Sequence, residues 1–290
     1  MSKVFYDKKI IDLIFEEFDK EKDSQDEDKL LNLVKRLPPE DVNNKGPKGN
    51  TVLMFVSVYG YSEIVKVLLS TKADINIKAN SSWNALMLAS SYSNTISNIE
   101  SVKLLIDTQA DINTQNYSGW TALMLASRYS NTESNIETVK LLIDAQADPN
   151  IKNSCGWTAL IYASRHSNMK SNIETVKLLI DAQADINIQN SGGYTALMKA
   201  SEYSNTESNI ETVKLLIDAQ ADINIQNNSG QTALILSSKY SNIESNIETV
   251  KLLIDAQADI NIQNNSGQTA LILLSRYSNI ETVKLLENYN

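Results

Sequence analysis

The sequence contains very little of the two residues that most often build metal sites and nucleophilic catalytic sites. It has one cysteine, Cys155, and one histidine, His166, among 290 residues. No disulfide can therefore form within the chain, and no zinc cluster of Cys and His ligands can assemble. A Ser-His-Asp or Cys-His catalytic site would have to use His166. We therefore expect a protein with no catalytic residues, no metal ion and no cofactor.

Glycine, proline and long apolar stretches are also scarce. Nine Gly and four Pro residues leave no G-x-x-x-x-G-K-[ST] or G-x-G-x-x-G motif that could hold a phosphate. No stretch approaches eighteen consecutive apolar residues, so we expect no membrane-spanning helix. The first twenty residues mix Lys, Asp and Glu into their apolar pattern, unlike a secretory signal. These features favour a reducing, intracellular compartment.

Negative charge predominates in the chain. The 35 Asp and Glu residues outnumber the 26 Lys and Arg residues and give a formal net charge of −9. A chain this acidic repels phosphate backbones and anionic lipid headgroups, so we expect neither nucleic acid nor a membrane surface as a partner. Hydrophobic residues make up 42% of the chain, which is enough for a folded core.

The sequence repeats itself with a period of 37 residues. The tripeptide Thr121-Ala122-Leu123 recurs from Thr158, Thr195, Thr232 and Thr269. Asn84-Ala85-Leu86 lies 37 residues before it, and Thr51-Val52-Leu53 a further 33 residues before that. An Ala-Asp-x-Asn motif keeps the same rhythm, starting at Ala73, Ala110, Ala147, Ala184, Ala221 and Ala258. Seven units therefore run from about residue 46 onward.

One unit predicts two helices and a hairpin-like loop. Thr121 precedes an apolar helix and can cap it through its hydroxyl. Ser134-Asn-Ile-Glu137 matches a capping box before a second helix, whose apolar stripe is Ile136, Val139, Leu142 and Ile143. Residues 150–156 are rich in Asn, Ser and Gly, which suit tight turns. Such a unit buries its apolar faces only against neighbouring copies.

These motifs resemble those of the ankyrin repeat. The family pattern around the first helix appears as Gly119-Trp-Thr-Ala-Leu-Met-Leu-Ala-Ser127, and later parts appear as Val139-Lys-Leu-Leu-Ile143 and Gln146-Ala-Asp-Pro-Asn150. The resemblance covers about residues 30–290 and implies an all-α solenoid of helix-turn-helix units with hairpin-like loops. We expect a degenerate capping repeat over residues 1–45 and seven ankyrin repeats over residues 46–290.

The units depart from the family pattern at two places. The Gly that usually ends the second helix is replaced by Gln, as at Gln146, or by Lys72 in the first unit. This exchange costs up to about 1 kcal/mol if the backbone stays left-handed. The five interior units also carry four extra residues between their helices, such as Ser130-Asn-Thr-Glu133. We interpret them as a longer turn; the alternative is a first helix extended by one turn.

In the ankyrin family, partners usually bind a concave surface made by the hairpin loops and the outer side of the first helices. By this resemblance, the residue just before the helix-capping position faces outward on that surface. In four successive units this residue is aromatic: Trp83, Trp120, Trp157 and Tyr194. Because Trp and Tyr are enriched at interface hot spots, we predict that these rings contact a partner.

A second aromatic column lies eight residues after the capping position. Its members are Tyr59, Tyr92, Tyr129, His166, Tyr203, Tyr240 and Tyr277. Arg128 and Arg165 directly precede two of them, and the resemblance places both positions on the concave side. We predict partner binding by Tyr92, Tyr129, His166, Tyr203, Arg128 and Arg165. The alternative is packing, in which the Tyr column fills the longer turn and the Trp column joins neighbouring loops.

The family also suggests a modification. Ankyrin repeats can be hydroxylated on the Asn of the Asp-x-Asn motif by an iron- and oxoglutarate-dependent asparaginyl hydroxylase. The matching residues are Asn113, Asn150, Asn187, Asn224 and Asn261. The chain would then be a substrate of that enzyme.

The function that the resemblance implies is a non-enzymatic, monomeric scaffold for protein-protein interaction. The Asn-, Ile- and Ser-rich, almost copied repeats look like those of ankyrin proteins from large DNA viruses of amoebae, which implies a host protein as partner and the host cytoplasm or nucleus as location. An adaptor that recruits a host ubiquitin ligase is an alternative. Because the sequence ends at Asn290 inside its last repeat, residues 1–45 would then do the recruiting.

Overall fold

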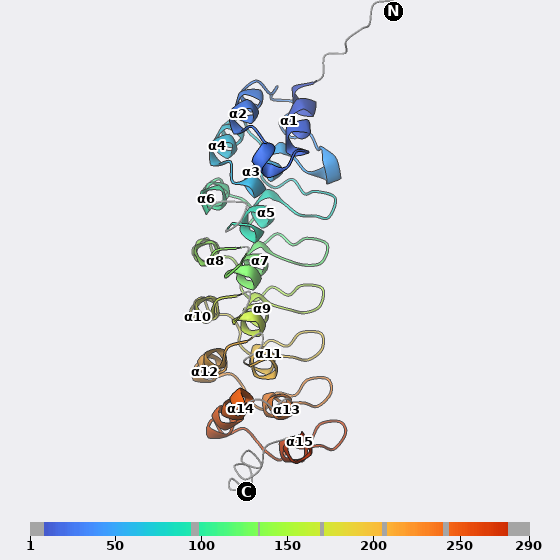
Figure 1. Cartoon of the computed structure of the whole chain (residues 1–290), viewed down its shortest axis with the longest axis vertical. Coiled ribbons are helices and arrows are strands. Elements are labelled where there is room, and N and C mark those ends of the chain that lie inside the picture. The colour runs from blue at the N-terminus through green and yellow to red at the C-terminus, as the bar shows by residue number, and fades with distance from the viewer. Residues whose placement is uncertain are drawn as a thin grey trace, which may run out of the picture.

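The structure is a computed structural model that describes residues 9–93, 99–132, 134–168, 171–204, 208–239 and 244–277. These residues form fifteen α-helices and two short 3-10 helices, and no strand apart from an isolated bridge between Ser204 and Ser208. Figure 1 shows helix pairs stacked into an elongated column, with a hairpin loop projecting from each unit on the same side. The predicted all-α solenoid with hairpin-like loops is confirmed.

Each of the first six units contributes a first helix, on the hairpin side, and a second helix on the opposite side, and the described part of the seventh unit contributes a first helix (Figure 1). The first helices are α3 (Val52–Tyr59), α5 (Ala85–Ser91), α7 (Ala122–Tyr129), α9 (Ala159–His166), α11 (Ala196–Glu202), α13 (Ala233–Lys239) and α15 (Ala270–Tyr277). The second helices are α4 (Ser62–Ser70), α6 (Ile99–Asp107), α8 (Ile136–Asp144), α10 (Ile173–Asp181), α12 (Ile210–Asp218) and α14 (Glu244–Asp255). First helices contact first helices of the next unit, and second helices contact second helices.

The capping residue starts the first helix as predicted. The hydroxyl of Thr121 accepts a hydrogen bond from the backbone N–H of Met124 at 3.3 Å. This bond satisfies one of the free amide groups at the start of α7. The helix then buries Ala122, Leu123 and Met124 almost completely between its neighbours.

The predicted capping box of the second helix is wrong. The side-chain oxygen of Asn135, not Ser134, accepts from the backbone N–H of Glu137 at 2.9 Å. Ser134 is fully buried, and its hydroxyl donates to the carbonyl of Ser90 in the preceding unit at 2.8 Å. The stacking of units thus draws the serine away from its own helix, and the next residue caps instead.

A continuous core runs along the stack, from Ile11 in α1 (Ile10–Phe18) to Leu274 in α15. In the second helices, Val139 and Leu142 are completely buried, whereas Ile136 and Ile143 on the predicted stripe are only half-buried. Full burial of one such side chain contributes roughly 1.5–3 kcal/mol. Each unit obtains this energy only with a neighbour on either side.

In the third unit the four extra residues lie between the helices, whereas in the sixth unit α14 already begins at the last of them, Glu244. In the first unit only two residues separate α3 from α4, whereas residues 130–135 separate α7 from α8, and α3 and α7 both have eight residues. The bounds of α7 and α8 therefore agree with the predicted longer turn and not with a longer first helix. Ser130 in this turn hydrogen-bonds Thr175 of the next unit at 2.7 Å and accepts from the N–H of Asn172 at 3.1 Å. The added turn therefore connects one unit to the next.

The N-terminal region forms a helix pair, α1 and α2 (Glu27–Lys35), on top of the first unit. The ring of Phe18 stacks on that of Phe55 in α3, with centroids 4.9 Å apart. The short 3-10 helices are Lys22–Ser24, between α1 and α2, and Pro47–Gly49, before α3. The division into a capping repeat over residues 1–45 and seven repeats over residues 46–290 stays a prediction, since residues 1–8 and the last expected helix lie outside the described residues.

The helix pair α1–α2 is joined by a buried carboxylate. Glu17 is 1% exposed, and its two oxygens lie 2.6 Å from the ammonium groups of Lys20 and Lys29. The hydrogen bond from Lys20, followed by that from Lys29, lowers the pKa of Glu17 from 4.5 to about 2. A carboxylate with a lowered pKa stabilises the folded state while it stays ionised.

Glu17→Gln should lower the melting temperature near pH 7, and the deficit should shrink as the medium becomes acidic. Because the folded pKa lies below the unfolded one, this stabilisation is complete above about pH 5 and disappears as the pH falls to about 2. Thermal melts of both proteins across this range measure the effect. Asp12→Asn, which removes an exposed carboxylate from the same helix, is the matched control. A Glu17→Gln deficit that stays constant with pH would assign it to packing instead.

Candidate functional site

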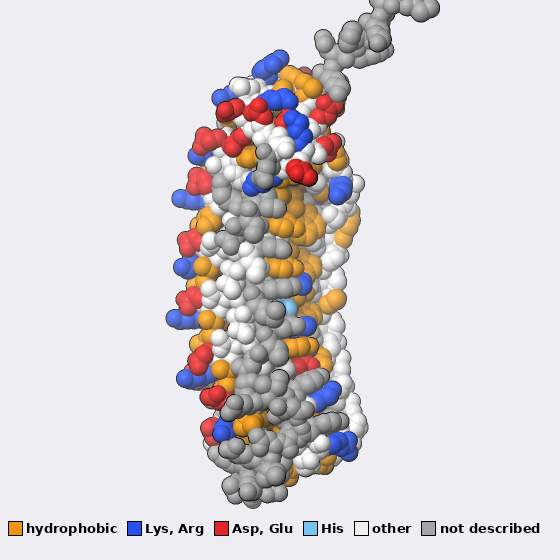
Figure 2. All heavy atoms as spheres, viewed as in Figure 1, with side chains coloured by type: hydrophobic (Ala, Val, Ile, Leu, Met, Phe, Trp, Pro, Cys, Tyr) orange, Lys and Arg blue, Asp and Glu red, His pale blue; other side chains and the backbone are white. Residues whose placement is uncertain are grey.

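The four aromatic residues predicted to face a partner lie along the hairpin side of the stack. Trp83, Trp120, Trp157 and Tyr194 each stand between a hairpin and a first helix, and each is half-buried. Part of each side chain is therefore accessible to solvent, and contact with a partner stays a prediction. Figure 2 shows the band of hydrophobic side chains beside the hairpins, with Lys and Arg side chains and the single histidine set into it.

Two of the rings, Trp120 and Trp157, are covered on one side by a residue that sequence reasoning missed. Tyr162 in α9 stacks on Trp120 with centroids 4.4 Å apart and on Trp157 with centroids 4.7 Å apart. It is 9% exposed, and its hydroxyl accepts a hydrogen bond from the side-chain amide of Asn153 at 2.9 Å. Burial raises the pKa of the Tyr162 hydroxyl.

A signal for Tyr162 is present in the sequence. The fourth residue after the capping position is Phe55, Leu88, Leu125, Tyr162, Lys199, Leu236 and Leu273 in the seven units. Only Tyr162 and Lys199 depart from a Leu or Phe at this position. Where the rest of the unit is nearly copied, such departures indicate residues with a special role.

The predicted arginines join the rings into clusters. The guanidinium carbon of Arg128 lies 5.3 Å from the Trp120 ring centroid, 5.0 Å from Tyr129 and 5.3 Å from Tyr162. One unit further on, Arg165 lies 5.7 Å from Trp157 and 4.5 Å from Tyr203. These are cation-π distances, which stabilise each pair by about 0.5–1 kcal/mol when partly exposed.

Lys199, the second unpredicted residue, continues the column. Its ammonium lies 3.5 Å from the ring centroid of Tyr194 and 2.7 Å from a carboxylate oxygen of Glu202. Both members of this ion pair are nearly buried. Burial lowers the pKa of Lys199, and the paired carboxylate opposes that shift. Lys199 and Glu202 therefore satisfy each other within the column.

The remaining residues predicted to bind a partner differ in how far they are buried. Tyr92, Tyr129 and Tyr203 are half-buried. His166 is only 8% exposed, so it offers a partner little surface, contrary to its predicted role. Tyr240 and the side chain of Tyr277 lie outside the part of the chain that the structure describes. Tyr117, which sequence reasoning did not select, is 78% exposed at a hairpin tip.

A cavity opens between the second and third units on this surface. Its volume is about 230 Å³, and its walls are Trp83, Ser91, Tyr92, Trp120, Leu125, Arg128 and Tyr129. Five of these seven are aromatic or cationic residues that the sequence predicted to bind a partner. The geometry thus brings Trp83, Tyr92, Trp120, Arg128 and Tyr129 together around one space.

The asparagines predicted to be hydroxylated join neighbouring hairpins. The side-chain oxygens of Asn113 and Asn150 accept the N–H of Asp148 and Asp185, each in the next unit, at 2.9 and 2.7 Å. Asn187 and Asn224 repeat this contact with Asp222 and Asp259, at 2.8 and 2.9 Å. Asn261 is exposed at the end of the series. These bonds couple units along the loop edge.

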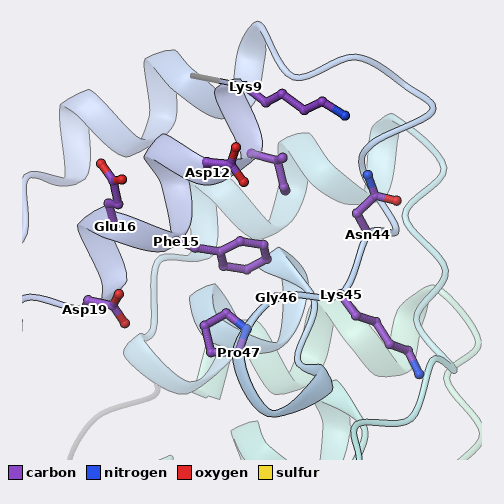
Figure 3. Close-up of a pocket in the computed structure, with 10 residues that line it drawn as sticks. Lys9, Asp12, Phe15, Glu16, Asp19, Asn44, Lys45, Gly46 and Pro47 are labelled. Carbon is purple, nitrogen blue, oxygen red and sulfur yellow. The ribbon is translucent and has the colours of Figure 1, made fainter. Parts of the chain in front are cut away.

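A larger cavity, of about 700 Å³, lies at the N-terminal helix pair. Figure 3 shows Asp12 and Glu16 on α1, with Asp19 directly after this helix, along one side, and Lys45 beside Gly46 on the loop opposite. The Phe15 ring lies against the Cα of Gly46, where a Cβ would collide with it. The ammonium of Lys45 already donates to the carbonyl of Lys78 at 2.7 Å. This loop is therefore fixed by packing to α1 and to the next hairpin.

Two further features of the described residues bear on function. No group of three or more His, Cys, Asp or Glu side chains in the described ranges is arranged to hold a metal ion. None of the helices that the structure describes combines the length and apolar character needed to cross a bilayer.

Comparison with known proteins identifies the family. No curated protein matches the chain. A family model described as ankyrin repeats (3 copies) matches residues 24–116, 94–153, 132–226 and 204–290, which together cover most of the sequence. The 37-residue unit with its capped first helix, its hairpin and its second helix therefore belongs to a known architecture, and the chain is a member of the ankyrin-repeat family.

Proposed function

We propose that this chain is a non-enzymatic scaffold that binds a partner protein on the surface formed by its hairpin loops and first helices, here called the hairpin face. The observation that carries the proposal is the cavity walled by Trp83, Tyr92, Trp120, Arg128 and Tyr129. Trp, Tyr and Arg are the residues that dominate binding energy at protein interfaces. The fold supports the proposal, since ankyrin repeats suggest an interaction scaffold.

The stacked rings also suit this role because they are already ordered. Trp120 contacts both Tyr162 and the Arg128 guanidinium, and Trp157 contacts both Tyr162 and Arg165. A partner that contacts a fixed ring does not have to immobilise it on binding, and so loses less conformational entropy. Tyr117 adds a freely exposed aromatic ring at the tip of the hairpin that ends in Trp120.

The finer parts of the proposal draw on resemblance. The almost copied repeats look like those of viral ankyrin proteins, which supports a host protein as the partner and the host cytoplasm or nucleus as the location. Recruitment of a ubiquitin ligase by residues 1–45 draws on the same resemblance. Hydroxylation of the Asp-x-Asn asparagines is favoured by the exposure of Asn113, Asn187, Asn224 and Asn261.

Trp83→Ala combined with Tyr117→Ala should reduce capture of the partner from a host-cell lysate at least about tenfold, as expected for two hot-spot rings. This pair leaves the Trp120–Tyr162–Trp157 stack intact. Quantitative mass spectrometry of pulled-down proteins measures the loss. Lys140→Ala with Lys177→Ala, on the exposed side of the second helices, is the matched control and should retain capture. The reverse pattern would place the binding surface on the second helices.

A further inference from the structure

The hairpin face contains one cation that the chain itself leaves unsatisfied. Arg128 is half-buried, and its Nε atom is buried without a hydrogen-bond partner. No carboxylate of the described residues forms an ion pair with it. The guanidinium instead lies over the rings of Trp120, Tyr129 and Tyr162. Aromatic faces attract a cation but accept no strong hydrogen bond, so the buried N–H group remains costly.

The other buried charged side chains discussed above, Lys199 and Glu17, form ion pairs. Lys199, two units further along the stack than Arg128, is paired with Glu202 at 2.7 Å. Glu17 is paired with Lys20 and Lys29, each at 2.6 Å. Arg128 differs from both because the wall beside it is the cavity of about 230 Å³ rather than another side chain. Because Arg128 lines this cavity, a ligand that enters the cavity lies beside the guanidinium.

The shape of the cavity restricts what that ligand is. The volume of about 230 Å³ is below the roughly 300–1,000 Å³ of pockets that hold a whole drug-sized ligand. This volume is enough for one side chain and the water it displaces, but not for a folded element. Its walls are the rings of Trp83, Tyr92, Trp120 and Tyr129 with Leu125, which favour a side chain with an apolar stem. Arg128 favours a negative end on that stem.

The charges at the repeat position of Arg128 also favour a negatively charged ligand. The position occupied by Arg128 carries a basic residue in three other units: Arg165, Lys239 and Arg276. This row contrasts with the chain's net charge of −9. Carboxylates are exposed on the second helices, such as Glu137 and Glu174, and also where the hairpins begin, such as Asp148 and Asp185. Although Glu202 occupies this position in the fifth unit, the four basic side chains attract a negatively charged partner segment to this part of the hairpin face.

We propose that the cavity between the second and third units binds an Asp or Glu side chain of an extended acidic segment in the partner protein, with its carboxylate on the guanidinium of Arg128. This inference rests on the proposed function and specifies the chemistry of the partner. The ring walls take the apolar stem of the side chain, and the basic row takes further carboxylates along the segment.

The test selects random twelve-residue peptides, displayed on phage, against the full chain and measures binding of synthetic copies by fluorescence anisotropy. Selected peptides should share an Asp or Glu at one position. Exchange of that residue for Asn or Gln should weaken binding to the wild-type chain at least about tenfold, since a charge-assisted contact is lost. Against Arg128→Gln, the same exchange should change binding less than about twofold.

Two further variants secure the comparison. Arg36→Gln removes an exposed positive charge far from the cavity and should keep the full difference between the acidic peptide and its amide counterpart. Arg128→Lys keeps the charge without the planar donor fork, and should give a difference between those of wild type and Arg128→Gln. If Arg128→Gln does not fold, the comparison of Arg128→Lys with the wild type still tests the inference.

Other results would overturn the inference in distinguishable ways. Peptides that bind the hairpin face, as shown by their loss with Trp83→Ala and Tyr117→Ala, but need no carboxylate would overturn the inference and leave the proposed function standing. A phosphoserine peptide that binds where its glutamate counterpart does not would overturn the carboxylate assignment. Failure to select any peptide for this face would count against both the inference and the proposed function.

Discussion

Tyr162→Ala should lower the free energy of unfolding by about 3–5 kcal/mol, the usual cost of truncating a buried aromatic residue. The side chain is 9% exposed and lies between the rings of Trp120 and Trp157, at 4.4 and 4.7 Å. Each aromatic pair adds about 0.5–1.5 kcal/mol to the burial of its area. Urea unfolding, followed by circular dichroism and separately by Trp fluorescence, measures the loss.

Two milder variants divide this effect into its parts. Tyr162→Phe keeps both stacked pairs and removes only the hydrogen bond from Asn153, so it should cost about 1 kcal/mol. Tyr162→Leu installs the residue that Leu125 and Leu236 provide in other units, and should fall between Phe and Ala. A loss below about 1 kcal/mol for Tyr162→Ala would mean that the two indoles close over the gap and do not depend on the tyrosine.

The position of Tyr162 in the stack adds a second expectation. A repeat array is stabilised by contacts between nearest neighbours, so a weak interface in the middle divides it into segments that unfold separately. Tyr162 belongs to the fourth unit and contacts Trp120 of the third. In Tyr162→Ala, the fluorescence of the Trp residues should therefore be lost before the helical signal of the outer units. A single coincident transition would show that the array remains cooperative through this interface.

The architecture was predictable because its signals are local and repeated. The capping role of Thr121 and the left-handed position of Gln146 each depend on residues within a few positions of one another. Both signals recur with the 37-residue period. A capping hydroxyl needs only the first turn of its own helix, and a left-handed residue needs only the end of its own helix. Copies that repeat the same local signal then favour one stacked arrangement.

The details of the hairpin face were less predictable because they depend on contacts between units. Tyr162 covers one side of Trp120, although it lies more than one period away in the sequence and on a different unit. Ser134 leaves its expected capping role because Ser90, in the preceding unit, offers a buried carbonyl. A pattern read within one copy contains neither contact.

Gln146→Gly, Gln183→Gly and Gln220→Gly together should raise the free energy of unfolding by about 2 kcal/mol. These residues have φ angles of 62°, 61° and 65°, in the left-handed region where a side chain costs about 1–2 kcal/mol. Glycine removes that cost. It also gives the unfolded chain more conformational freedom, which lowers the free energy of unfolding by about 0.5–1 kcal/mol per site. The three sites lie in different units, so their effects should add approximately.

The backbone hydrogen bonds around Gln146 require the left-handed backbone conformation but no particular side chain. The N–H of Gln146 donates to the carbonyl of Ile143 at 2.8 Å, and that of Ala147 donates to Leu142 at 2.9 Å. The Gln146 side chain is exposed, so its removal sacrifices no buried surface. Both hydrogen bonds should survive in the glycine variant, which makes backbone strain the main difference between the two proteins.

The neighbouring alanines provide a matched control for this triple exchange. Ala145, Ala182 and Ala219 directly precede the three glutamines and have φ angles of −80°, −79° and −82°. Glycine there relieves no strain and only adds freedom to the unfolded chain, so the triple alanine-to-glycine variant should lose about 2 kcal/mol. Urea unfolding of both variants beside the wild type measures the opposite signs. If both triple variants lose stability, the left-handed glutamines carry no strain, and weak helix endings are not a feature of these repeats.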